Sequence, residues 1–251
     1  MGSGASMDWW EDEFCERLAA GGRFVVRYDH RDTGRSASYA PGAPEYTGDD
    51  LIADVVGILD ALDIGRAHVV GMSMGGAIAQ VVALDHPDRV ASLTLIATSP
   101  AGPDEDLPGM SQETIAAFQV DKPDWSDRDA VIDHMVHLER LCASRSVPFD
   151  EASFREICAR AFDRTVKVES MMTNHHLVDG GDRWRERLPE LRIPTLVIHG
   201  TDDPILPHEH GEALAREIPD ARLLTLEETG HELPRRTWDA AIPAILELTS
   251  G

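Results

Sequence analysis

Short apolar runs and longer helical patterns alternate along the first hundred residues. Residues 24–28, 67–70 and 90–97 are apolar runs of the length expected for buried strands. Residues 51–62 place apolar side chains three and four positions apart, which predicts a helix with one buried face, and residues 76–84 form a second helical pattern. This alternation is typical of a parallel sheet flanked by helices.

The alternation stops after residue 100 and resumes near residue 191. Only helical patterns occur in between (residues 112–120, 127–143, 150–162 and 166–176). Two further pairs of strand and helix follow (residues 195–199, 209–218, 222–226 and 236–246). The sequence therefore predicts an α/β fold with a mostly parallel sheet and helices on both faces. Its core would comprise residues 1–100 and 191–251, and residues 101–190 would form a helical cap.

The pentapeptide Gly71-Met72-Ser73-Met74-Gly75 lies between a predicted strand and a predicted helix. A Gly-x-Ser-x-Gly in this setting is typical of the nucleophile elbow of the α/β-hydrolase fold. The sharp turn would hold Ser73 in a strained conformation with its hydroxyl above the sheet edge, and the backbone N–H of Met74 would face a developing oxyanion. The alternative is a glycine-rich turn with a surface serine, which the strand and helix around it disfavour.

A serine nucleophile needs a base and an orienting carboxylate, which follow the serine in the order acid, then base in this fold. Among the 11 histidines, His231 stands out because it follows a glycine in the last loop between a strand and a helix. Asp202 and Asp203 follow the strand at residues 195–199. We favour Asp203 as the acid because it precedes a proline, and the other aspartate would cap the turn.

Composition narrows the function classes. The chain has 251 residues and a formal net charge of −22, which repels nucleic acid and anionic lipid. It has no apolar run long enough for a transmembrane helix and no signal-peptide pattern at its N-terminus. Its three cysteines (Cys15, Cys142 and Cys158) form no close pair. We therefore expect a cytoplasmic monomer or homodimer that binds neither nucleic acid nor membrane.

Several motifs together resemble the aclacinomycin (anthracycline) methylesterase group of the α/β-hydrolases. They are the elbow, the turn at residues 27–36, the loop at residues 200–207 and the Gly230-His231 pair. The resemblance covers nearly the whole chain and is weakest between residues 101 and 191. It implies Ser73 as nucleophile, Asp203 as acid and His231 as base in carboxyl-ester hydrolysis. It also implies a small-molecule ester substrate, with neither a metal nor an organic cofactor.

The same resemblance interprets the N-terminus. Residues 1–5 look like the loop after the third strand of the family, which makes the backbone N–H of Ser3 the second oxyanion donor, with Gly4 as the alternative. Trp9 and Trp10 would then lie near the pocket mouth or pack under the first helix. The first hairpin and the third strand are absent, so the strands at residues 24–28 and 67–70 would lack the partner between them. Either these two strands pair directly, or the start was assigned at an internal methionine, or the chain is an inactive remnant; we favour the misassigned start.

Two hypotheses follow for the function. The first is a serine hydrolase that cleaves a small or medium hydrophobic ester, such as a methyl ester, through an acyl-enzyme. A peptidase, lactonase, carbon–carbon hydrolase or perhydrolase would use the same triad. The second is a non-catalytic or impaired ligand-binding protein on a hydrolase scaffold, which the intact triad disfavours. Dehalogenase and epoxide-hydrolase chemistry are disfavoured because they use a carboxylate where Ser73 stands.

Overall fold

The computed structural model describes residues 1–100 and 106–250, so residues 101–105 of the predicted cap lie outside the described part. Its sheet has the order β1-β2-β3-β4, and all the neighbouring strands are parallel. The strands are β1 (Ala67–Met72), β2 (Val90–Ile96), β3 (Thr195–Gly200) and β4 (Arg222–Leu226). Each coincides with a predicted apolar run, so these four predictions are confirmed.

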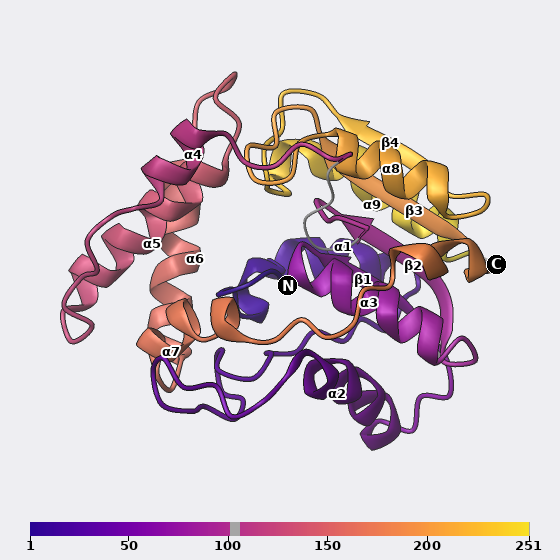
Figure 1. Cartoon of the computed structure of the whole chain (residues 1–251), viewed down its shortest axis with the longest axis horizontal. Coiled ribbons are helices and arrows are strands. Elements are labelled where there is room, and N and C mark those ends of the chain that lie inside the picture. Colours follow the sequence, from indigo (N-terminus) through magenta and orange to yellow (C-terminus); the bar gives the residue numbers. More distant parts are fainter. Residues whose placement is uncertain (101–105, 251) are drawn as a thin grey trace.

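Helices cover both faces of the sheet (Figure 1). One face packs against α2 (Gly48–Ala61), α3 (Met74–Asp85) and α8 (Glu209–Glu217), and the other against α1 (Asp12–Ala20) and α9 (Trp238–Leu248). Successive residues of β3 point to opposite faces of the sheet. Val197 packs with the first group of helices and Ile198 with the second. This double burial is why the strands are continuously apolar in sequence.

Two details of the helices were not predicted from the sequence. Thr47 is the N-cap of α2, and Asp50 completes a reciprocal capping box with it. Helix α1 was not among the predicted elements. Its residues Phe14 and Leu18 are buried against Trp238 of α9, and a contact so distant in sequence leaves no local signal.

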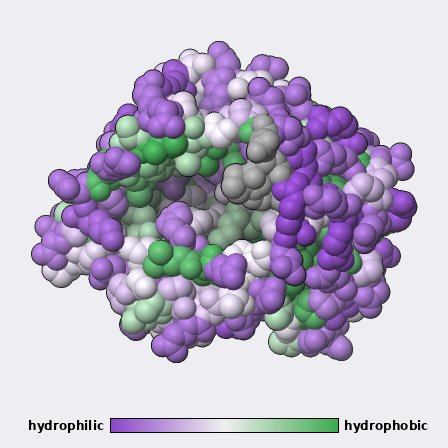
Figure 2. All heavy atoms as spheres, viewed as in Figure 1, coloured by the Kyte–Doolittle hydropathy of each residue, from purple (hydrophilic) through white to green (hydrophobic). Residues whose placement is uncertain are grey.

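The helices between β2 and β3 lie to one side of the sheet (Figure 1). They are α4 (Gln112–Ala117), α5 (Arg128–Cys142), α6 (Glu151–Arg164) and α7 (Val168–Thr173). Val131, Met135, Cys158 and Met171 are among the buried side chains of a hydrophobic cluster that α5, α6 and α7 form, with Trp9 packed against it. Figure 2 shows that the molecule is hollowed between this helical segment and the sheet, with apolar side chains on part of the rim. No helix in the described residues is long and apolar enough to span a membrane.

Arg164 of α6 ties this helical segment to the N-terminal part of the chain. Its guanidinium bonds to the carboxylates of Asp8 and Asp29, and all three side chains are largely buried, with exposed fractions of 14%, 8% and 7%. Arg160, one turn earlier on α6, reaches Asp8 and Asp12 from a more exposed position. A buried guanidinium shared by two carboxylates fixes the helix against the core.

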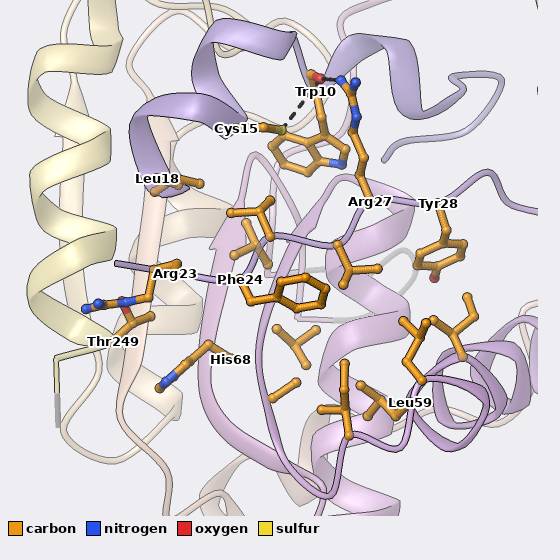
Figure 3. Close-up of a pocket in the computed structure, with 18 of the residues that line it drawn as sticks. Trp10, Cys15, Leu18, Arg23, Phe24, Arg27, Tyr28, Leu59, His68 and Thr249 are labelled. Atoms are coloured by element: carbon orange, nitrogen blue, oxygen red, sulfur yellow. Dashed lines mark hydrogen bonds between the residues drawn. The ribbon is translucent and has the colours of Figure 1, made fainter. Parts of the chain in front are cut away.

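The strand predicted at residues 24–28 is wrong. The segment is extended but belongs to no sheet, and none of its main-chain N–H groups donates to another described main-chain group. The suggestion that it pairs directly with β1 is also wrong, because β1 is the edge strand of the sheet. A cavity of about 510 Å³ lies between the two, and its lining includes Phe24 and Val26 from the segment and Val69 and Val70 from β1. Figure 3 shows Phe24 among the side chains that line it.

This groove explains why an apolar run failed to become a strand. An apolar run becomes a strand only when a neighbour supplies hydrogen-bond partners, and none of the described residues fills the space. Phe24 is consequently 85% exposed and Val26 is 41% exposed, whereas the residues of β2 and β3 are almost all buried. The edge of the sheet next to Ser73 is therefore open in the described structure.

Candidate active site

Ser73 lies in the turn between β1 and α3 with backbone angles φ 52° and ψ −120°. This region is rarely adopted by residues other than glycine, as the predicted elbow requires. The turn is tight because Gly71 has no side chain: a Cβ at Gly71 would lie 2.2 Å from the carbonyl oxygen of Gly75. The main chain is held on both sides, since the Ser73 N–H donates to Ile96 and the Ser73 carbonyl accepts from Thr98 Oγ1.

A chain of hydrogen bonds joins the three predicted catalytic side chains. His231 Nε2 is 2.9 Å from Ser73 Oγ, and His231 Nδ1 is 2.8 Å from Asp203 Oδ2. Ser73 follows β1, Asp203 follows β3 and His231 follows β4, so all three come from the carboxyl ends of parallel strands. Parallel strands present these ends on one rim, which is how residues 158 positions apart meet.

Asp203 is buried and fully hydrogen-bonded. Its Oδ1 accepts the N–H groups of Ile205 and Leu206, and its Oδ2 faces His231. Burial alone would raise the pKa of this carboxyl, but the His231 charge and the histidine hydrogen bonds outweigh burial and hold it well below its usual value. Asp203 is therefore an anion at neutral pH. Asp202 points elsewhere and accepts the hydroxyl of Ser144 at 2.6 Å.

His199 is a second histidine beside the same carboxylate, which sequence reasoning missed. Its Nε2 is 2.8 Å from the carbonyl oxygen of Leu206 and 3.3 Å from Asp203 Oδ2, and the side chain is completely buried. Because both neighbours are acceptors, Nε2 must hold a proton and donate it between them. One feature of the sequence could have indicated this contact. His199 stands four residues before Asp203, near the end of β3, and therefore close to the loop that carries the aspartate.

The helical segment also reaches His231, the predicted base. The N–H of His231 donates to the carbonyl of Cys142, the last residue of α5, at 2.7 Å. A Cβ on Gly230 would lie 2.4 Å from that same carbonyl oxygen, so a glycine is required where α5 crosses the loop. This contact explains the glycine before His231, whose role sequence reasoning left open. It also means that α5 positions the catalytic loop.

Residues 1–5 lie against the nucleophile. A Cβ on Gly2 would be 3.2 Å from Ser73 Cβ, so this segment lies directly beside Ser73. The Gly4 N–H donates to His175 Nδ1 at 3.0 Å and is thereby occupied. The N–H groups of Ser3 and Met74 have no acceptor among the described residues, so both are free to bind an oxyanion.

A small cavity of about 70 Å³ opens beside His231. Its wall includes Trp9 and Trp10 from the N-terminal segment and Glu139 from α5. Trp10 also stacks on Phe14 of α1, so it both lines the cavity and packs against the first helix. Trp9 instead packs with the helical segment. No cluster of histidine, cysteine or carboxylate side chains suited to a metal ion occurs in the described part of the chain.

Comparisons with known proteins identify the family and the fold. The model of a family described as the alpha/beta hydrolase fold matches residues 2–234. The rhodomycin D methylesterases DauP of Streptomyces sp. (strain C5) and DnrP of Streptomyces peucetius are each 33% identical over 259 residues, covering 97% of this chain and 87% of the relative. Among solved structures, the esterase EaEST of Exiguobacterium antarcticum has a TM-score of 0.77 at 22% identity and covers 100% of this chain and 90% of its own. The meta-cleavage product hydrolase CumD of Pseudomonas fluorescens IP01 has a TM-score of 0.74 at 22% identity, with coverage of 99% and 87%.

Proposed function

The chain belongs to the alpha/beta hydrolase fold family and is a carboxylic ester hydrolase, and we propose that Ser73, His231 and Asp203 are its catalytic triad. The observation that supports the triad best is the pair of hydrogen bonds from Ser73 Oγ through His231 to Asp203, at 2.9 and 2.8 Å. A serine hydroxyl in contact with an imidazole that is itself held by a buried carboxylate is the arrangement that activates serine.

In the first half of the reaction, Ser73 Oγ attacks the ester carbonyl carbon while His231 Nε2 takes the serine proton. The N–H groups of Met74 and Ser3 stabilise the negative charge that forms on the carbonyl oxygen. His231 then gives its proton to the alkoxy oxygen, the carbon–oxygen bond breaks, and the alcohol leaves. Asp203 stays ionised throughout, fixing the proton on His231 Nδ1 and stabilising the imidazolium.

In the second half, a water molecule takes the place of the alcohol. His231 Nε2 removes a proton from this water as it attacks the acyl carbon, and returns the proton to Ser73 Oγ when the acyl-enzyme breaks down. The products are one carboxylic acid and one alcohol for each ester. No cofactor enters this sequence of steps.

We infer a small or medium hydrophobic ester as the substrate, with a methyl ester as the preferred class. The named activity of the two Streptomyces relatives supports the methyl ester. The small cavity at His231 supports a small group there, because its wall is largely apolar and its volume suits a few heavy atoms. The helical segment at residues 106–190 would act as the cap, since α5 supplies part of that wall.

The test compares the wild-type chain with Ser73→Ala. Both are incubated with p-nitrophenyl acetate, with rhodomycin D and with a fluorophosphonate probe. We expect turnover and covalent labelling in the wild type, release of methanol from rhodomycin D, and loss of all three signals in the variant. Equal labelling and turnover in the two proteins would refute the triad. Labelling without release of methanol would keep the triad and refute the methyl-ester substrate.

A further inference from the structure

Glu139 is a half-buried carboxyl in the wall of the cavity beside His231, and the triad mechanism does not use it. It lies in the last turn of α5 and shares the wall of the small cavity with His231. Two contacts fix its place. The indole N–H of Trp9 donates to Glu139 Oε1 at 3.0 Å, and three residues later the Cys142 carbonyl accepts the N–H of His231.

The environment of Glu139 favours the uncharged acid. No described residue forms an ion pair with it, whereas its neighbour Arg140 pairs with Glu151 on the outer side of the helix. Burial is the main cause that raises the pKa of Glu139, to about 7; nearby Glu232 also raises it, while the Trp9 hydrogen bond and His231 lower it. Up to neutral pH, much of the protein therefore presents a carboxylic acid here.

One oxygen of this carboxyl remains available. Trp9 engages Oε1, and Oε2 has no hydrogen-bond partner among the described residues. Apolar side chains, including Phe154, Ile157 and Leu233, make up much of the remaining cavity wall. A polar atom in such surroundings is costly unless a ligand or water bonds to it, so the free oxygen is placed to meet a polar atom of a bound substrate.

Resting on the triad proposed above, we propose that Glu139 determines substrate specificity by hydrogen-bonding a keto or hydroxyl oxygen that neighbours the scissile ester. The preferred substrate class is therefore a β-keto or β-hydroxy ester rather than a plain aliphatic ester. A keto oxygen can only accept a hydrogen bond, so it needs the protonated acid. A hydroxyl can donate as well as accept, so it can bond to either form of Glu139.

The experiment measures kcat/KM for methyl 3-oxobutanoate, methyl 3-hydroxybutanoate and methyl butanoate at about pH 6 and about pH 8, on either side of the pKa of Glu139. The ratio of each functionalised ester to methyl butanoate is compared within one protein. Catalytic steps common to both esters cancel in this ratio. Chemical activation by the keto group is the same in every variant, so only differences between variants and pH values are interpreted.

We expect the keto preference of the wild type to fall about tenfold from the lower to the higher pH, the effect of one hydrogen bond. The hydroxy preference should persist. Glu139→Gln keeps an acceptor for Trp9 and gives the cavity a permanent N–H donor, so its keto preference should not depend on pH. Glu139→Leu should lose both preferences at both pH values.

Other titratable groups near the cavity could produce a pH effect, and a control separates them. They are His231 and Glu232 on the loop after β4, Cys142 on α5, Cys158 on α6, and Glu11, Asp150, Arg235 and the amino terminus of Met1 in the cavity wall. Burial lowers the pKa of the Met1 amine to about 5, below the pH range of the experiment. Glu232→Gln removes the other carboxyl that raises the pKa of Glu139, and burial also raises the pKa of Glu232 itself. The keto preference of this variant should still fall with pH.

Three results would overturn the proposal. One is a keto preference that is independent of pH in the wild type. Another is an unchanged set of ratios in both Glu139 variants, and the third is no hydrolysis of the keto and hydroxy esters by a protein that hydrolyses p-nitrophenyl acetate. In each case the loss of p-nitrophenyl acetate turnover in Ser73→Ala would leave the triad standing, so the two proposals fail separately.

Discussion

Because Ser73 is held in a strained backbone conformation, we expect the Ser73→Gly variant to be more stable than the Ser73→Ala variant. Ser73→Ala and Ser73→Gly both remove the hydroxyl and its hydrogen bond to His231. They differ only in the Cβ atom. At φ 52° and ψ −120° the Cβ is the source of the strain, and the bonds from Ile96 and Thr98 to the main chain prevent the turn from relaxing.

The expected difference follows from three terms. Relief of the backbone strain stabilises the glycine variant by about 1–3 kcal/mol. The greater freedom of glycine in the unfolded chain costs about 0.5–1 kcal/mol. Removing one buried carbon costs at most about 0.8 kcal/mol. The sum of the three terms makes the free energy of unfolding of Ser73→Gly about 1 kcal/mol greater than that of Ser73→Ala. For a chain of this size this difference raises the Tm of the glycine variant by about 2–4 °C.

Thermal unfolding by calorimetry and urea denaturation of the two purified variants measure this difference. Both variants lack the proposed nucleophile, so we expect neither to hydrolyse ester and activity should not complicate the comparison. A Ser73→Gly midpoint equal to or below that of Ser73→Ala in both experiments would refute the assignment of strain to the serine Cβ. The proposal that Ser73 is the nucleophile would then depend only on the hydrogen bonds that link it through His231 to Asp203.

Three further predictions concern other parts of the molecule. Asp203→Asn should lower kcat for ester hydrolysis about 10³–10⁴-fold because the amide favours the wrong imidazole tautomer, whereas Asp202→Asn, one residue away, should retain most of the activity. Arg164→Met should lower the free energy of unfolding in urea by about 3–5 kcal/mol because it strands two buried carboxylates, and the more exposed Arg160→Met should cost less than about 1 kcal/mol. Phe24→Ser should change the free energy of unfolding by no more than about 0.5 kcal/mol, because the side chain is 85% exposed, and should weaken binding of an apolar fluorescent dye to the groove. A large loss of stability in Phe24→Ser would show that the ring packs in solution.

The parts of the site that could be predicted from sequence are those encoded by a few adjacent residues. The elbow around Ser73 is such a case, since the glycines, the apolar strand and the helix form one continuous pattern. Asp203 and His231 follow because each stands just after a strand, and parallel strands deliver their carboxyl ends to one rim. The choice of Asp203 over Asp202 agrees with the geometry, in which only Asp203 lies against His231.

The prediction at residues 24–28 failed for the converse reason. An apolar run states that a segment prefers to be buried and extended, but it does not name the neighbouring strand. Without that neighbour the segment borders a groove, and its largest side chain stays exposed. A similar limit hid His199, whose place beside Asp203 depends on how the loop after β3 folds back over the strand.

The last turn of α5 marks the boundary between these two cases. The sequence predicts a helix here, and the structure shows that Val131, Met135 and Val136 are among its buried residues. Glu139 stands four residues after Met135 and therefore lies on the same side of the helix, whereas Arg140 lies on the outer side and pairs with Glu151. Glu139 accepts the indole N–H of Trp9 and shares a cavity wall with His231. Periodicity assigns Glu139 to a face of the helix, but only tertiary contacts decide what a polar residue on that face meets. The proposed role of Glu139 in specificity depends on those contacts.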